Sequence, residues 1–166
     1  MGRIVIPKEI RRTMHIREGD PLEIYTDRDG EVIFKKYSPI GEIGDFAAGY
    51  CEVLAKAIGR GVLITDRDEV VAASGVSKKD FLEKRLSKPM EQAMEGRTAF
   101  RREGEGLELL EGNGTVCADI VAPILANGDV IGSVTLVGGN GEAVAGEADL
   151  RLLQVSAGLL GRHMES

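Results

Sequence analysis

The strand predicted at residues 31–36, Glu-Val-Ile-Phe-Lys-Lys, restricts the fold most strongly, because it carries apolar side chains on both faces. Side chains alternate between the two faces of a strand, so Val32 and Phe34 lie on one face and Ile33 on the other. The segment at 22–26 and the intervening Asp-Arg-Asp-Gly predict that this strand closes a hairpin. Burial on both faces requires apolar partners that so short a hairpin does not contain.

The first 37 residues therefore predict a unit that is not stable alone. A short strand is expected at residues 2–7, followed by about two helical turns at 7–16 with Ile10 and Met14 on one face. Chains shorter than about 40 residues usually need disulfides, a metal or oligomerisation to fold. This segment contains no cysteine. We expect an obligate dimer, in which a second copy covers one face of the hairpin.

Charge is distributed unevenly along the chain. The formal net charge is −6, yet residues 1–17 hold five cations and one anion, whereas residues 18–37 sum to −3 and residues 38–166 to −7. A basic segment on an acidic chain indicates an anionic partner for that segment, and the alternative is an ordinary solvated charged face. The five cations are Arg3, Lys8, Arg11, Arg12 and Arg17.

Residues 2–37 resemble the swapped-hairpin DNA-binding domain of AbrB-type transition-state regulators. The resemblance rests on Gly-Arg-Ile-Val-Ile-Pro, Glu-Ile-Arg-Arg, Gly-Asp, Leu-Glu-Ile and a final Lys-Lys-Tyr, in that order. It implies that two chains interleave their hairpins into one barrel-like dimer, in which arginines of the paired strand and the short helix grip double-stranded DNA. The matching residues are Arg3, Arg11 and Arg12, with Lys8 as a secondary candidate.

The family pattern has a further basic strand before its Gly-Arg pair, whereas this sequence starts at Met1, inside the pattern. We expect a start codon assigned too late, with in-frame upstream codons that encode an alternating segment with at least one cation. A trimmed or degenerate domain is the alternative.

After a short linker, two predicted helices carry apolar residues at spacings of three and four, which is typical of a helical seam. Each helix also has a second apolar stripe, so one stripe is expected to contact its own domain and the other a partner. We expect the seams to mediate self-association, and Leu54→Glu with Leu153→Glu to give monomers; the alternative is one broad core stripe. The seams are Ile40, Ile43, Ala47, Tyr50, Leu54 and Ala57, then Leu150, Leu153, Ala157, Leu160 and Met164; the second stripe includes Phe46, Val53 and Ile58.

Between these helices, several apolar runs with turn signals predict strands, interrupted by a helical stretch at about 77–96. This order is typical of an α+β domain with an antiparallel sheet and flanking helices. Residues 121–138, which turn at Asn-Gly and return through Ile-Gly-Ser-Val, resemble the closing strand pair of GAF domains. The expected organisation is a DNA-binding domain at 1–37, a linker and connecting helix at 38–59, and a GAF-like sensor or oligomerisation domain at 60–166.

Together the resemblances imply a DNA-binding transcription regulator of the AbrB type with a C-terminal GAF domain, active in sporulation. It is expected to be a homodimer or homotetramer in the cytoplasm, associated with the nucleoid, with no cofactor and no catalytic residue. Whether the GAF domain binds a small molecule stays open. One alternative is a GAF-fold free methionine sulfoxide reductase that uses Cys51 and Cys117, which a turnover assay would reveal. Another is an antitoxin, which would carry a disordered toxin-binding tail.

Other candidate sites have structural explanations. Cys51 and Cys117 are too few and too far apart for a disulfide framework or a zinc site, and fit small buried thiols. His15 and His163 match no metal or catalytic spacing. The glycine-rich residues 137–147 lack the Gly-Lys-Ser/Thr of a phosphate-binding loop and predict a connection. The longest apolar run, at 116–126, is interrupted by an aspartate and a proline, so no membrane segment is expected.

Overall fold

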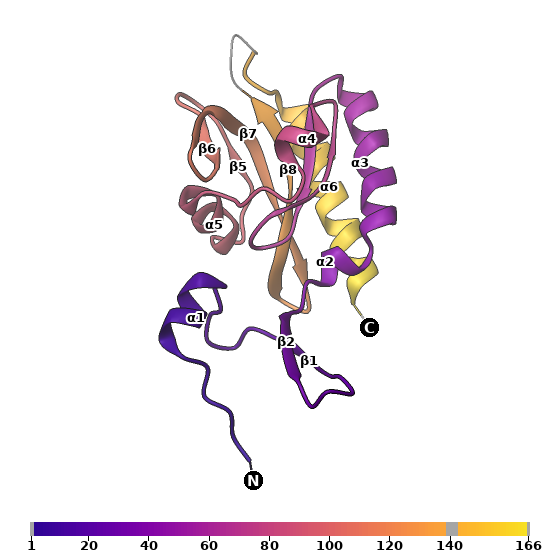
Figure 1. Ribbon diagram of the computed structural model, residues 1–166. Helices are drawn as coiled ribbons and strands as arrows, with labels where there is room; N and C mark the ends of the chain where they lie inside the picture. The colour runs from indigo at the N-terminus through magenta and orange to yellow at the C-terminus, as the bar shows by residue number, and fades with distance from the viewer. Residues whose placement is uncertain (1, 139–142, 166) are drawn as a thin grey trace. The chain divides into compact units, whose positions relative to one another are not determined.

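The computed structural model describes residues 2–138 and 143–165 (Figure 1). The chain divides into two compact units, Met1–Ser38 and Pro39–Ser166. The first holds one helix and a hairpin, and the second holds a sheet with helices on both faces. The glycine-rich connection predicted at 137–147 lies partly outside the described residues.

The first unit contains α1 (Lys8–Thr13), β1 (Leu22–Thr26) and β2 (Val32–Lys36). β1 and β2 pair antiparallel, which confirms the predicted hairpin. Its turn is organised by Asp27, whose Oδ1 accepts the backbone N–H groups of Asp29 at 2.9 Å and Glu31 at 3.0 Å. The hydrogen bond from the Glu31 N–H lowers the pKa of the Asp27 carboxyl. Gly30 has a φ of 87°, a conformation that glycine adopts without strain.

The strand predicted at residues 2–7 is wrong for the single chain: these residues are extended but form no strand. A strand requires a neighbour that shares its backbone hydrogen bonds, and the hairpin in this unit pairs β1 only with β2. Ile4 and Val5 are consequently exposed. No residue from 2 to 38 is buried, so the described part of this unit has no core of its own.

The second unit is built on one antiparallel sheet with the strand order β4-β3-β8-β7-β5, in which β6 also pairs with β7. The long β7–β8 hairpin turns at Asn127 and Gly128, whose φ values are 52° and 83°. Two successive positive φ values are typical of a tight hairpin turn and confirm the predicted Asn-Gly turn. The strands are β3 (Val62–Thr65), β4 (Val70–Ser74), β5 (Phe100–Arg101), β6 (Leu107–Leu110), β7 (Asn113–Ala126) and β8 (Asp129–Gly138).

Helices cover both faces of this sheet. One face packs against α3 (Gly44–Ile58) and α6 (Glu147–Met164), which run side by side in Figure 1. The other face packs against α4 (Lys78–Phe81) and α5 (Lys88–Glu95). Two apolar cores result, one on each face.

Two predicted helices are interrupted. The helix expected from Ile40 is α2 (Pro39–Glu42) followed by α3, because Ile43 between them leaves the helical region with φ −108° and ψ 35°. The stretch predicted at 77–96 is α4 and α5, separated by residues that form isolated bridges, including Leu86 with Leu110. This bridge holds the chain extended, and Ser87 then starts α5 by accepting the Met90 N–H at 3.2 Å.

The prediction that the helical seams contact a partner is wrong. Leu54 and Leu153 are 4% and 0% exposed and belong to the core between α3, α6 and the sheet. Part of the second stripe is open instead: Val53 on α3 and Val155 and Leu159 on α6 are 68%, 59% and 55% exposed, whereas Ile58 packs against the core. The Leu54→Glu and Leu153→Glu pair would place two carboxylates in the core and unfold the domain rather than dissociate it.

Two glycines of α6 predict opposite effects of the same substitution. Gly158 faces open space, so Gly158→Ala should stabilise the protein by up to about 1 kcal/mol, because alanine is the better helix former. A Cβ on Gly161 would lie 2.0 Å from the backbone oxygen of Leu125 in β7, so Gly161→Ala should destabilise it by about 1–3 kcal/mol. Urea unfolding measures both. Two shifts of the same sign would contradict the close packing of α6 on β7.

Candidate nucleic-acid interface

The basic side chains of α1 gather on one side of the helix. Successive helical residues are about 100° apart, so Lys8, Arg11 and Arg12 lie within about a quarter to a third of a turn. All three are exposed, and Ile10 projects from the opposite side. Arg3 is also exposed but lies on the extended segment before the helix. The structure thus places three of the four predicted DNA-binding residues on one helical face, which we call the basic face.

The last turn of α1 ends with hydrogen bonds to the backbone oxygens of Arg11 and Arg12. The Ile16 N–H donates to the Arg11 oxygen at 2.8 Å, and the His15 N–H donates to the Arg12 oxygen at 3.3 Å. His15 has a φ of 53°, the left-handed conformation that commonly ends a helix. These bonds form a Schellman motif, so the direction of the chain after α1 is set by the backbone of Arg11 and Arg12.

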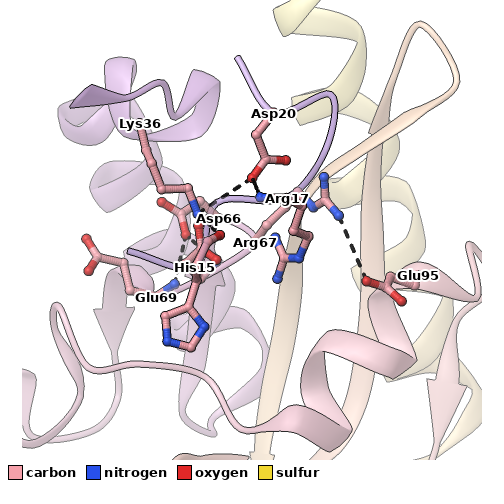
Figure 2. A network of polar contacts seen from close by, with 9 residues as sticks. His15, Arg17, Asp20, Lys36, Asp66, Arg67, Glu69 and Glu95 are labelled. Carbon is pink, nitrogen blue, oxygen red and sulfur yellow. Dashed lines mark hydrogen bonds and ion pairs between the residues drawn. The ribbon is translucent and has the colours of Figure 1, made fainter. Parts of the chain in front are cut away.

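A polar clamp joins this turn to the hairpin. Lys36 Nζ on β2 donates to the His15 oxygen at 2.8 Å and lies 3.9 Å from Asp20 Oδ2. Asp20 Oδ2 also accepts the Arg17 N–H at 2.8 Å (Figure 2). Sequence reasoning missed this clamp, although Asp20 and Lys36 belong to the Gly-Asp and Lys-Lys-Tyr motifs. The sequence feature that could have predicted it is the presence of an acidic residue in one motif and a basic residue in another motif of the same small unit.

A second polar cluster, also missed, lies in the other unit. Asp119 is 0% exposed, and its two oxygens lie 2.6 Å from Arg60 Nη2 and 2.8 Å from Arg102 Nε. Arg60 additionally donates to the backbone oxygens of Val137 at 2.9 Å and Ala143 at 3.2 Å. One carboxylate is therefore shared by two guanidinium groups. An aspartate inside the apolar run at 116–126 was the available signal.

Three buried hydroxyl groups line the sheet on the α5 side. Ser133 Oγ lies 2.8 Å from Thr65 Oγ1 and 2.9 Å from Thr135 Oγ1, and Thr65 Oγ1 also donates to Met94 Sδ at 3.8 Å. These groups hydrogen-bond to one another, so their burial requires no further partner.

The cysteines lack the features of activated nucleophiles. Burial raises the pKa of the Cys51 thiol to about 12, and this thiol donates to the Val62 oxygen at 3.0 Å. Burial and the nearby Asp119 carboxylate also raise the pKa of Cys117. A thiol needs a lowered pKa to react as a thiolate near neutral pH. The raised pKa of each thiol therefore favours a structural role for both cysteines over the reductase alternative.

The remaining site types gain no support from the described residues. Among them, no group of three or more His, Cys, Asp and Glu side chains is arranged to hold a metal ion. His163 is exposed and stacks on Phe46 with 4.8 Å between the ring centroids. A search of the same residues finds no helix with the length and apolar character of a membrane span.

Comparison with known proteins agrees with this division of the chain. Residues 42–165 match the family described as stage V sporulation protein T C-terminal, transcription factor. Residues 1–42 match the family described as antidote-toxin recognition MazE, bacterial antitoxin. Stage V sporulation protein T of Bacillus subtilis is 48% identical over 167 residues, which cover 99% of this chain and 93% of that protein. The transition state regulatory protein AbrB of the same organism is 51% identical over 51 residues, covering 27% of this chain and 52% of that protein.

Solved structures identify the fold of the second unit. The GAF domain of an Acinetobacter phosphoenolpyruvate-protein phosphotransferase has a TM-score of 0.61 at 14% identity, covering 78% of this chain and 84% of that chain. A free methionine-R-sulfoxide reductase from Thermoplasma acidophilum has a TM-score of 0.54 at 13% identity, covering 74% and 94%. Such low identity shows a shared fold and carries no catalytic residue to this chain. The predicted α+β class with a GAF-like antiparallel sheet is confirmed.

An AbrB-like helix-and-hairpin unit followed by a GAF-like domain defines a two-domain transcription regulator. The chain belongs to the stage V sporulation protein T family.

Proposed function

We propose that the protein binds double-stranded DNA as a homo-oligomer through Arg3, Arg11 and Arg12, with help from Lys8, and thereby regulates transcription during sporulation. The observation that carries this proposal is the exposed basic face of α1 in a chain whose net charge is −6. The names of the two Bacillus subtilis relatives, a sporulation protein and a transition state regulator, support it. DNA binding would place the protein at the nucleoid.

Arginine suits this role because its planar guanidinium donates two parallel hydrogen bonds to a phosphate. Phosphate contacts supply affinity and orientation, while base edges and DNA shape supply specificity. A concentrated basic face on a protein of net negative charge favours that face as the DNA-binding surface.

Oligomerisation is part of the proposal for two reasons. The first unit has no buried residue among residues 2–38, so a second copy would supply the apolar cover that the hairpin lacks. In the second unit, α3 and α6 expose apolar side chains beside a filled core, which fits a further contact between copies. A dimer formed through the hairpins, and a tetramer formed from two such dimers through α3 and α6, would cover both apolar surfaces.

Catalysis is not part of the proposed function, because neither cysteine is activated. An antitoxin role is also disfavoured: the family match at 1–42 concerns the first unit, and the described residues from 39 onward are mostly helices and strands packed around two cores rather than a disordered tail.

The experiment that tests the DNA interface is the salt dependence of binding. A dimer presents six copies of the three arginines, so the slope of log affinity against log salt should reach a magnitude of up to about 5, at roughly 0.9 per phosphate. Arg11→Ala removes two contacts per dimer and should flatten the slope by about 2. Arg11→Lys keeps the charge but loses the two-pronged hydrogen bonding, so it should restore binding only in part. Fluorescence anisotropy with a labelled duplex measures all three.

The control is Arg151→Ala on α6, which removes an exposed arginine from the acidic unit and should leave the slope unchanged. Arg11 points away from the Ile10 side of α1, so the variant should fold. A folded Arg11→Ala protein with the original slope would exclude Arg11 from the interface.

A further inference from the structure

α1 needs support from outside its own hydrogen bonds. It has six residues, none of them buried, and helices this short are not stable in isolation. The basic face can present its arginines in one fixed direction only if contacts with the hairpin hold the helix. The inference drawn from these contacts rests on the proposed DNA binding through Arg11 and Arg12.

The contacts that hold α1 converge on its last turn. The backbone oxygens of Arg11 and Arg12 accept the N–H groups of Ile16 and His15. His15 is therefore tied to the end of the helix that carries the two arginines. Its own oxygen accepts a hydrogen bond from Lys36 Nζ at 2.8 Å, across 21 positions of the sequence. This hydrogen bond connects the basic face to β2.

Asp20 completes the connection. Its side chain is 7% exposed, lies 3.9 Å from Lys36 Nζ, and accepts the Arg17 N–H at 2.8 Å. An ion pair shielded from solvent holds its geometry better than an exposed pair. Asp20 thus steadies the ammonium group of Lys36 and the loop that returns from α1 to the hairpin.

We propose that Lys36 and Asp20 are positioning residues for DNA binding: they fix the end of α1 to β2 and so set the direction in which Arg11 and Arg12 meet phosphates. Neither needs to touch DNA. The function assigned to Lys36 differs from that of a phosphate-binding lysine, and the two roles make different predictions.

The first test is a double-mutant cycle between Lys36→Met and Arg11→Ala, measured by anisotropy against salt. If Lys36 only neutralised a phosphate, Lys36→Met would flatten the slope by about 2 per dimer and add to Arg11→Ala. If it positions the basic face, Lys36→Met should flatten the slope by about 4, since Arg11 and Arg12 contacts are both lost. Arg11→Ala should then have little further effect. Lys36→Arg, which keeps a donor, should recover part of the slope.

Lys35→Met is the matched control. It removes the same charge from the neighbouring residue, whose Nζ lies over the Tyr25 ring at 5.4 Å rather than at the end of α1. Its effect should be small and additive with Arg11→Ala. Additivity of Lys36→Met as well would overturn the positioning role.

Asp20→Asn supplies a second test that does not depend on Lys36→Met folding. Asparagine can still accept the Arg17 N–H, but the substitution removes one negative charge from the DNA-binding unit. A purely electrostatic effect would tighten binding. Loss of positioning should weaken it about threefold to tenfold at constant salt. Unchanged or tighter binding by Asp20→Asn would overturn the inference while leaving the proposed function intact. Failure of Arg11→Ala alone to flatten the slope would instead exclude Arg11 from the DNA interface, and a slope that stays flat in the parent protein would remove the proposed function.

Discussion

Replacing Asp119 with alanine is expected to lower the free energy of unfolding by about 3–5 kcal/mol, the cost of breaking a buried ion pair. The substitution leaves the guanidinium groups of Arg60 and Arg102, whose side chains are only 12% and 16% exposed, without their carboxylate. It also opens space beside Gly138, where a Cβ would lie 1.9 Å from Asp119 Oδ1. Urea unfolding of the purified protein measures the change.

The matched comparison is Glu147→Ala, which removes the carboxylate of an exposed pair with Arg101 at 3.0 Å. Exposed pairs contribute about 0–1 kcal/mol, so this variant should remain close to the parent protein. Equal effects of the two substitutions would mean that burial of Asp119 adds nothing to the stability of the sheet.

The second prediction with a large expected effect concerns the contact between copies of the chain through α6. Val155→Glu with Leu159→Glu places carboxylates on the exposed stripe of α6 and should halve the mass of the oligomer in analytical ultracentrifugation. Burying an unpaired carboxylate in an apolar contact costs several kcal/mol, whereas both side chains are already exposed within the single chain. The free energy of unfolding of the dissociated protein should therefore change little.

Lys88→Glu is the control for charge. It adds the same two units of negative charge at the exposed start of α5, on the opposite face of the sheet, and should leave the mass unchanged. If the α6 double variant keeps its mass, the exposed stripe is not a contact between copies.

Local features were predictable because their causes lie within a few residues. Asp27 and Gly30 form the first hairpin turn, and Asn127 and Gly128 form the second, through side-chain acceptors and positive φ values that these residue types supply. The grouping of Lys8, Arg11 and Arg12 follows in the same way from the helical repeat.

The orientation of the two long helices was not predictable from spacing. α3 carries apolar residues on both the seam and the second stripe, so the sequence pattern alone could not say whether Leu54 or Val53 faces the sheet. Packing decides it, because only one stripe can meet the sheet, and Leu54 is in the core.

The sequence by itself determined the hairpin turns and the basic character of α1, since each depends on neighbouring residues. Only the tertiary structure decided which helical stripe is open, that Asp119 lies between Arg60 and Arg102, and that Lys36 reaches His15. These contacts join residues 17 to 59 positions apart. Which residues meet in such contacts depends on how the whole chain packs, and a local sequence pattern does not contain that information.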